Sequence, residues 1–134
     1  MKRLALLSVV ALMLVAVFAP VAMAQAPGEI DVQQVTLGPG ESVTVSGTIQ
    51  CLEGSAYAVH LTVRQRTSGN LYNTTDDSVY GQCDKTTGPT LFTVTTFGEG
   101  PFHRGPASVS FDSYVCDSNY TCYFDQGVED VRIR

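Results

Sequence analysis

The feature that most constrains the fold is an uninterrupted two-residue alternation over residues 41–51. Every second position of this stretch is apolar or small, and the positions between carry hydroxyl or amide side chains. The apolar set is Val43, Val45, Gly47, Ile49 and Cys51. Successive side chains of a β-strand point to opposite faces, and β-branched residues favour that conformation. The stretch therefore predicts a strand that buries one face in a core and exposes the other to water.

Further stretches repeat this pattern and predict about seven strands. Residues 57–63 and 107–115 carry apolar side chains at most alternate positions, and Gly and Pro cluster between such segments. Shorter apolar segments lie at 30–37, 79–83, 91–97 and 128–134. No segment shows a sustained helical period. The sequence thus predicts an all-β fold, an antiparallel immunoglobulin-like β-sandwich, with a small closed β-barrel as the alternative.

Local irregularities in the pattern add three expectations about single segments. The apolar phase changes near Gln33 and Gln34, which predicts a β-bulge in the first strand. Residues 67–77 are polar and predict an exposed loop with at most a short edge strand at 71–72. Residues 91–97 are apolar at both phases and predict a central strand with a protein-covered face.

The first residues, 1–24, are predicted to be a cleaved secretory signal peptide. A positively charged start precedes an apolar run, and residues 22–24 show the small-x-small pattern of a cleavage site. The run is shorter than the roughly 20 apolar residues of a membrane anchor, and it ends at Pro20. Cleavage would release one domain, residues 25–134, as a secreted protein without a membrane anchor. Its residues 25–29 are expected to be a mobile lead-in.

Charge argues against one class of partner. The chain has 8 basic and 13 acidic residues, and the leader removes two of the basic ones, which changes the net charge from −5 to −7. Lys85 is then the only lysine. Binding to nucleic acid depends on Lys and Arg contacts to phosphates. Nucleic acid is therefore not expected as a partner, and the acidic balance favours solubility outside the cell.

Four cysteines, Cys51, Cys83, Cys116 and Cys122, all lie in the exported part. An even number of cysteines in an oxidising compartment predicts two disulfides. A zinc site would need close Cys-x-x-Cys pairs or a histidine near a cysteine in sequence, and the chain has neither. No bound metal and no cofactor are expected.

Strand phase helps to choose among the three possible cysteine pairings. Tyr114-Val115-Cys116 resembles the Tyr-x-Cys of immunoglobulin strands, which would pair Cys51 with Cys116. However, Cys116 lies in the polar phase of its strand, whereas Cys51 and Cys83 lie in the apolar phases of theirs. The phases favour a buried Cys51–Cys83 bridge and a Cys116–Cys122 bridge that closes a surface loop over residues 117–121.

No catalytic constellation is evident. A hydrolase triad needs a nucleophile, a histidine and an acid on a rigid frame. His60 falls on the polar side of a predicted strand and His103 in a turn, and neither lies in a nucleophile motif. The chain is therefore predicted not to be an enzyme, and a hydrolase is kept only as a third hypothesis.

Acidic residues cluster in the second half of the chain, at 76–77 and at Asp112, Asp117, Asp125, Glu129 and Asp130. They indicate either a calcium-binding loop or a solvated acidic surface. The Asp-x-Asp-x-Asp-Gly spacing of a calcium loop is absent, which favours the surface.

Two triplets match the acceptor pattern for N-glycosylation, at Asn73 and Asn119. Both fall in predicted loops. They are possible glycosylation sites, depending on the host that produces the protein.

Six aromatic residues offer the one hint of a binding surface. Most of them lie at outward phases near the cysteines: Tyr72, Tyr80, Tyr114, Tyr120, Tyr123 and Phe124. Tyrosine supplies contact area at low entropic cost, which suits a recognition surface. The alternative interpretation is that these rings cover strand edges and disulfides.

Several segments together resemble a family of small exported bacterial immunoglobulin-like proteins of unknown function. They are residues 43–51, 63–65, 82–84 and 102–109. The resemblance implies a sandwich with a Cys51–Cys83 bridge and no known activity. Residues 115–122 and 127–128 bear a weaker likeness to the tail of the enediyne-binding apoproteins of the neocarzinostatin type. That likeness implies a cleft for an aromatic ligand.

Three functional hypotheses follow. The first is a secreted, monomeric, non-enzymatic module that binds a protein or a cell-surface partner. The second is a carrier of a small apolar or aromatic ligand in a sandwich cleft, and the third is a hydrolase. An apolar cleft rimmed by Tyr and Phe would favour the second, and convergent histidine and carboxylate groups the third.

Overall fold

The computed structural model describes residues 25–83, 87–98 and 100–134. The predicted signal peptide, residues 1–24, and Lys85 lie outside the described residues. The strands are β1 (Ile30–Leu37), β2 (Ser42–Cys51), β3 (Ala56–Arg66), β4 (Tyr72–Gln82), β5 (Gly88–Phe97), β6 (Gly105–Cys116) and β7 (Cys122–Ile133), with a short 3-10 turn, η2 (Pro39–Glu41), between β1 and β2. The described part of the chain holds no helix long and apolar enough to cross a membrane.

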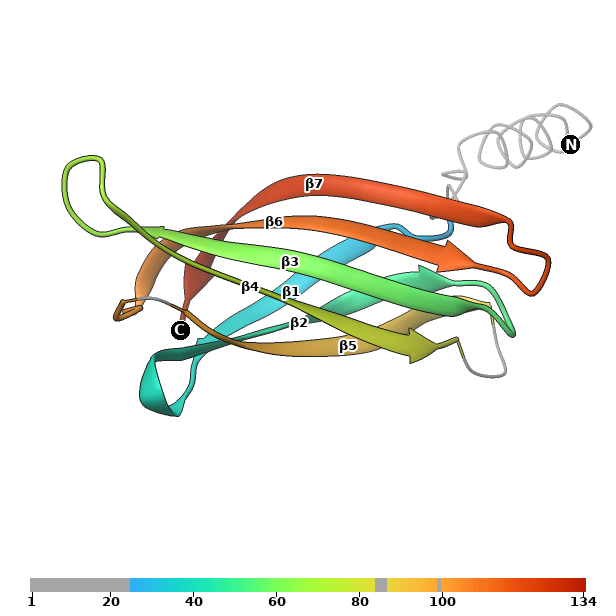
Figure 1. The fold of residues 1–134 in the computed structure, drawn as a ribbon, viewed down its shortest axis with the longest axis horizontal. Helices are drawn as coiled ribbons and strands as arrows, with labels where there is room; N and C mark the ends of the chain where they lie inside the picture. Colours follow the sequence, from blue (N-terminus) through green and yellow to red (C-terminus); the bar gives the residue numbers. More distant parts are fainter. Residues whose placement is uncertain (1–24, 84–86, 99) are drawn as a thin grey trace, which may run out of the picture.

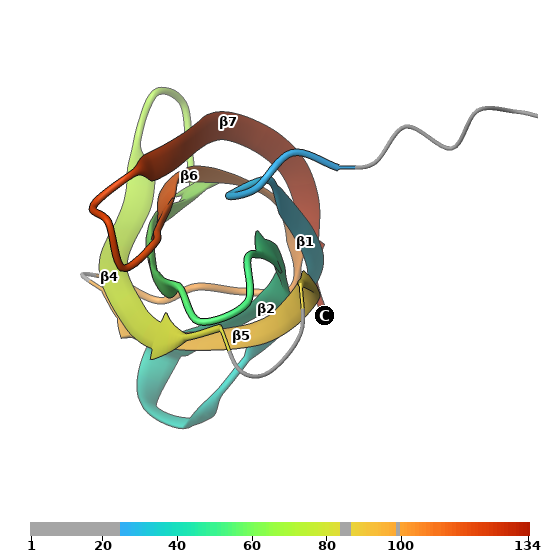
Figure 2. The same ribbon diagram turned by 90° about the vertical axis from the view of Figure 1, so that its right-hand side faces the viewer.

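The strands form one mixed sheet in the order β4-β3-β6-β7-β1-β2-β5 (Figure 1). Its two halves, β4-β3-β6-β7 and β1-β2-β5, are antiparallel within themselves, and a single parallel pair, Val35 with Ile133, joins them. The end strands β4 and β5 lie against each other, so the sheet curls into a nearly closed barrel (Figure 2). The predicted all-β fold of about seven strands is confirmed, and its closure approaches the barrel alternative.

The core consists of the inward positions of the predicted alternations. Val43, Val45 and Ile49 of β2 are fully buried, as are Val59 and Val63 of β3. The inward positions of β5 and β6 add Phe92, Val94, Val109, Phe111 and Val115. Burying such a side chain stabilises the fold by roughly 1.5–3 kcal/mol. The apolar side chains at every second position of these strands are therefore the ones that form the core.

Each large inward ring on three of the strands faces a glycine on the neighbouring strand. The cross-strand pairs are Tyr57 with Gly81, Phe92 with Gly47, and Phe111 with Gly127. A Cβ atom on Gly81 would lie 2.4 Å from Cζ of Tyr57, far inside van der Waals contact. The interior is too narrow for a ring and an opposing side chain, so glycine leaves the space that each ring fills.

Two disulfides pin the same end of the barrel. Cys51 at the end of β2 is bonded to Cys83, which directly follows β4, and this bond ties the two halves together. Cys116 and Cys122 lie opposite each other on β6 and β7 and are also bonded. This is the pairing that the strand phases favoured, and Cys51 does not pair with Cys116.

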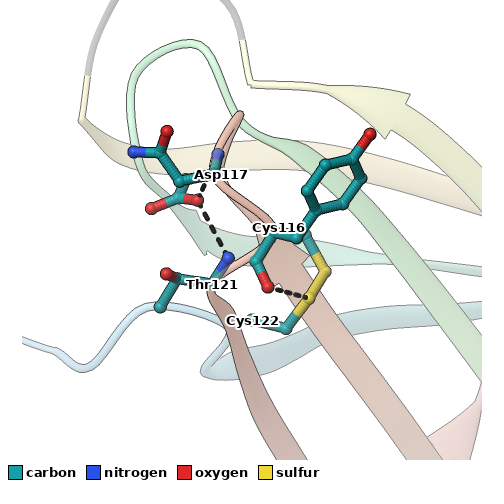
Figure 3. The surroundings of a disulfide bond; sticks show 6 residues. Cys116, Asp117, Thr121 and Cys122 are labelled. Carbon is teal, nitrogen blue, oxygen red and sulfur yellow. Dashed lines mark hydrogen bonds between the residues drawn. A yellow bond between two sulfur atoms is a disulfide. The ribbon is translucent and has the colours of Figure 1, made fainter.

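The loop between Cys116 and Cys122 is shaped by its first residue. The Asp117 carboxylate accepts hydrogen bonds from the backbone N–H groups of Asn119 and Thr121, at 2.8 and 3.0 Å (Figure 3). A side chain that hydrogen-bonds its own backbone two residues on is a turn-forming device. The loop therefore returns the chain so that the two cysteines meet.

The expected bulge is confirmed, but one expected loop and one expected strand start are wrong. The register of β1 shifts between Val32 and Gln34, as predicted. Residues 72–77 are not a loop, because β4 begins at Tyr72 and pairs with β3 throughout. A strand at the end of the sheet needs few apolar side chains, since its ladder to β3 supplies the backbone hydrogen bonds. Strand β7, which lies between β6 and β1, begins at Cys122, six residues before the predicted start, because it pairs with β6 from that residue on.

The predictions for residues 91–97 and 25–29 are also wrong. Strand β5 lies at the end of the sheet, and its outward side chains Leu91 and Phe97 are each 74% exposed. The lead-in is fixed, because the N–H of Gly28 donates to the carbonyl of Gln50 at 2.7 Å. The buried Ser113 hydroxyl donates to the carbonyl of Gly28 at 2.6 Å. These hydrogen bonds depend on tertiary neighbours that local sequence does not reveal.

Gly81→Ala is expected to destabilise the protein, because its methyl group would overlap the buried Tyr57 ring. Overpacking of this kind costs about 1–3 kcal/mol. Urea unfolding should show a lower midpoint than the wild type, while the exposed neighbour Gln82→Ala should unfold like the wild type. An unchanged midpoint for Gly81→Ala would show that the ring does not need the glycine.

Candidate functional site

The outer face of β4, β3, β6 and β7 carries a line of aromatic rings that crosses the strands. Tyr80 lies opposite Ala58, Ala58 opposite Tyr114, and Tyr114 opposite Phe124. We call Tyr80, Tyr114 and Phe124 the aromatic row. It lies at the end of the barrel that holds both disulfides, two residues from Cys116 and Cys122.

The rings of the aromatic row project into solvent. Tyr80 is 72% exposed, Tyr114 41% and Phe124 75%. The centroids of Tyr114 and Phe124 are 6.2 Å apart with their planes tilted by 45°, a favourable arrangement for an aromatic pair. Ala58 also points outward but is only 3% exposed, because it lies at the foot of the taller flanking rings. The rings of the aromatic row thus project from the surface, and Ala58 lies lower between Tyr80 and Tyr114.

Two shallow grooves flank Tyr114. The first groove, of about 380 Å³, lies between Tyr80 and Tyr114 and has Ala56 and Gly81 among its lining residues. The second groove, of about 370 Å³, lies between Tyr114 and Phe124 and is also lined by Asp112, Asp125 and Gln126. One groove is therefore apolar and aromatic, and the other is aromatic and acidic.

A polar row runs beside the aromatic row on the same face, two residues further from the disulfides on each strand. It consists of Ser78, His60, Asp112 and Gln126, which lie opposite one another in that order. Nδ1 of His60 and Oγ of Ser78 are 2.8 Å apart, within hydrogen-bond distance. The row places hydrogen-bonding groups along the whole length of the aromatic row.

A serine, a histidine and an aspartate thus occupy neighbouring positions, but they do not form a triad. No hydrogen bond or ion pair joins His60 to Asp112 within the described residues, so no acid orients the ring. A triad also needs free backbone N–H groups that stabilise an oxyanion. The backbone N–H of Ser78 instead donates to the carboxylate of Asp77 at 2.7 Å. The arrangement suits binding better than acyl transfer.

The positive charges are gathered at one end of the barrel. All five arginines of the described residues lie at the end opposite the disulfides: Arg64, Arg66, Arg104, Arg132 and Arg134. Acidic residues lie at both ends, with Glu29, Glu53 and Asp117 at the disulfide end and Glu41, Glu129 and Asp130 at the arginine end. The aromatic row therefore lies in the half of the barrel that has carboxylates but no arginine among the described residues.

The other three predicted aromatics are exposed but lie outside the row. Tyr72 is at the arginine end, where the Arg64 guanidinium lies 3.9 Å from the centre of its ring. Tyr120 is 92% exposed in the loop between the cysteines, and Tyr123 is 39% exposed on β7. The structure thus brings three of the six residues together.

The two possible glycosylation sites differ in their surroundings. Asn119 is exposed in the loop between Cys116 and Cys122, as expected. Asn73 lies in β4 rather than in a loop, and its Nδ2 donates a hydrogen bond to the carbonyl of Pro101 at 2.6 Å. A glycan on Asn73 would disturb this hydrogen bond.

The clustered acidic residues are dispersed over β4, β6, β7 and the loop between the last two. No group of three or more His, Cys, Asp or Glu side chains in the described ranges is arranged to hold a metal ion. Asp125 instead accepts a hydrogen bond from the backbone N–H of Ile30 at 3.2 Å, across the seam between β7 and β1. Its carboxylate helps to join the two halves of the sheet.

Glu129 lies on the same seam. Burial raises the pKa of its carboxyl group, the negative charges of Asp31 and then Asp125 raise it further, and the backbone N–H of Val32 lowers it. The ionised carboxylate is therefore disfavoured in the folded state. It is the group on this seam through which pH acts on stability.

Gln65 is a structural residue that sequence analysis missed. It is fully buried, its Nε2 donates to the carbonyl of His103 at 2.7 Å, and its Oε1 accepts from the N–H of His103 at 2.9 Å. These bonds hold the segment between β5 and β6. The sequence does contain a signal for this role, because Gln65 is a polar residue at an inward position of the alternation in β3.

Comparisons with known proteins identify no family for this chain. No protein-family model matches it, and no curated protein does so. One solved structure, a catalytically inactive OgpA from Akkermansia muciniphila in complex with an O-glycopeptide, glycodrosocin, aligns with a TM-score of 0.36 and 13% identity. The alignment covers 87% of this chain and 35% of that one. A similarity this low supports neither a shared fold nor a shared activity.

Glu129→Gln is expected to stabilise the protein at pH 7 and to lose this effect in acid. A raised pKa means that the folded state binds more protons than the unfolded state, so stability falls as pH rises through that range. The ionisation penalty is present at pH 7 and absent well below about pH 4.3, the ordinary pKa of Glu. Urea unfolding at pH 7 and pH 3.5 measures the difference. A gain that is equal at both values would contradict the assignment, and Asp130→Asn serves as the exposed control.

Proposed function

We propose that this chain is a secreted, non-enzymatic binding module that holds a macromolecular partner on the aromatic row. The observation that carries the proposal is the alignment of three exposed rings across four paired strands. Contiguous exposed apolar surface marks interaction sites, and tyrosine is enriched among the residues that dominate binding energy. A sheet that is pinned by two disulfides at this end keeps the rings in place.

The location and fold class of this module are part of the proposal. The two disulfides suit an oxidising environment, which agrees with the signal peptide predicted at residues 1–24. The grouping of β1-β2-β5 and β4-β3-β6-β7 supports an immunoglobulin-like arrangement. We expect the module to act as a monomer. A ligand carrier has less support, because the grooves beside Tyr114 are shallow and open rather than enclosing.

Affinity capture tests this function. The exported chain, residues 25–134, is immobilised and exposed to culture medium and solubilised cell envelope of the producing strain, and bound material is identified by mass spectrometry and sugar analysis. A specific partner should be retained by the wild type and lost with Tyr114→Ser, because this ring lines both grooves.

Phe97→Ser is the matched control, since Phe97 is as exposed as Phe124 but lies on β5. The control should retain the partner. Retention by Tyr114→Ser at the wild-type level would place the binding surface elsewhere and refute the proposed site.

A hydrolase is the second candidate, and the contact between His60 and Ser78 is the observation that favours it. Under the binding proposal, Ser78 is not an activated nucleophile, because nothing orients the histidine. A serine-reactive fluorophosphonate probe should therefore not label the protein. Labelling that disappears in both Ser78→Ala and His60→Ala would overturn the non-enzymatic proposal.

A further inference from the structure

We propose that the aromatic row binds an extended segment of a cationic protein partner, with an apolar side chain in the first groove and a Lys or Arg side chain in the second. This inference rests on the proposed function and names the chemistry of the partner. It depends on three observations: the different linings of the two grooves, their separation, and the placement of the arginines along the barrel.

The first groove fits an apolar side chain. The Tyr80 and Tyr114 rings form its sides, and Ala56 and the Cα of Gly81 form its floor. An aliphatic or proline side chain there would contact aromatic surface on two sides and remove that surface from water. Each Å² of apolar area buried is worth roughly 25 cal/mol. The hydroxyl groups of the two tyrosines remain free to bond the backbone of the bound segment.

The second groove fits a cation. The Tyr114 and Phe124 rings form its walls, and Asp112 lies on the same outer face. The Asp112 side chain is exposed and has no hydrogen-bond partner within the described residues, whereas the Asp125 carboxylate is turned toward Ile30 on β1. An aromatic face attracts an ammonium or guanidinium group, and the Asp112 carboxylate adds to this attraction.

The separation of the grooves matches the repeat of an extended chain. The first groove lies over β3 and the second between β6 and β7, about one and a half strand spacings or 7 Å away across the strands. The first groove also lies about two residues nearer the disulfides, roughly 6.6–6.8 Å along the strands, so the two grooves are about 10 Å apart. A polyproline II segment repeats every three residues, about 9 Å along its axis. Such an extended segment, crossing the strands diagonally, would therefore place residues i and i+3 in the two grooves.

Charge complementarity favours a cationic protein over a neutral oligosaccharide. Asp112 lies in the second groove, and all five arginines of the described residues lie at the other end of the barrel. A basic segment therefore meets attraction at the aromatic row, and none of the described arginines lies beside it to repel it. A neutral sugar chain would gain nothing from this arrangement.

A displayed library of random 12-residue peptides, selected on the exported chain, tests the inference. The selected peptides are expected to share an apolar residue three positions from a Lys or Arg. A synthetic selected peptide should bind at least tenfold more weakly when Glu replaces that basic residue, as measured by fluorescence anisotropy. Moving the basic residue to the next position should weaken binding to a similar extent.

Protein variants locate the binding site. Tyr114→Ser should abolish binding, and Asp112→Asn should weaken it several-fold and reduce its salt dependence. Asp130→Asn and Phe97→Ser should bind like the wild type. Selected peptides without a basic residue, or equal binding by Asp112→Asn, would overturn the inference.

A panel of soluble oligosaccharides separates this inference from the proposed function. Binding of an oligosaccharide that depends on Tyr114, without binding of basic peptides, would reject the cationic partner and keep the binding module. Peptide binding that is unaffected by Tyr114→Ser would reject both.

Discussion

The register between β3 and β6 is the constraint on which the rest of this structure depends. It sets Ala58 opposite Tyr114, and so it decides which residues share a line on the outer face. A slip of β6 by one residue would turn the buried Val109 toward water and would bury Asp112. Each fully buried aliphatic side chain contributes roughly 1.5–3 kcal/mol, so the core strongly opposes that slip. The outer aromatic row is therefore positioned by the same interactions that fill the interior.

Covalent bonds reinforce this register where the binding surface lies. The Cys116–Cys122 bond joins residues that are directly opposite on β6 and β7, two residues from Tyr114 and Phe124. The Cys51–Cys83 bond ties the two halves of the sheet at the same end. A shallow site has few side chains around the ligand to hold it in place. A rigid binding surface loses less conformational entropy when the ligand binds.

Local sequence was most informative where a side-chain pattern decides the structure. The alternation of 43–51 and the phase change near Gln34 were correctly predicted, because burial of one face leaves a two-residue period. The polar segment 72–77 was wrongly assigned to a loop, because backbone pairing with β3 leaves no trace in its side chains. The exposure of Leu91 and Phe97 was missed, because local sequence does not show which strand ends a sheet.

The sequence by itself determined the all-β class, the inward faces of the alternating strands and the favoured cysteine pairing, since each follows from the local phase of side chains along a strand. It also indicated that aromatic residues gather near the cysteines. Only the tertiary structure decided that Tyr80, Tyr114 and Phe124 form one row beside Asp112, and that the arginines lie at the far end. These relations depend on register and strand order, which arise from contacts between residues far apart in sequence. This register is favoured because it buries the inward side chains of all the strands at the same time.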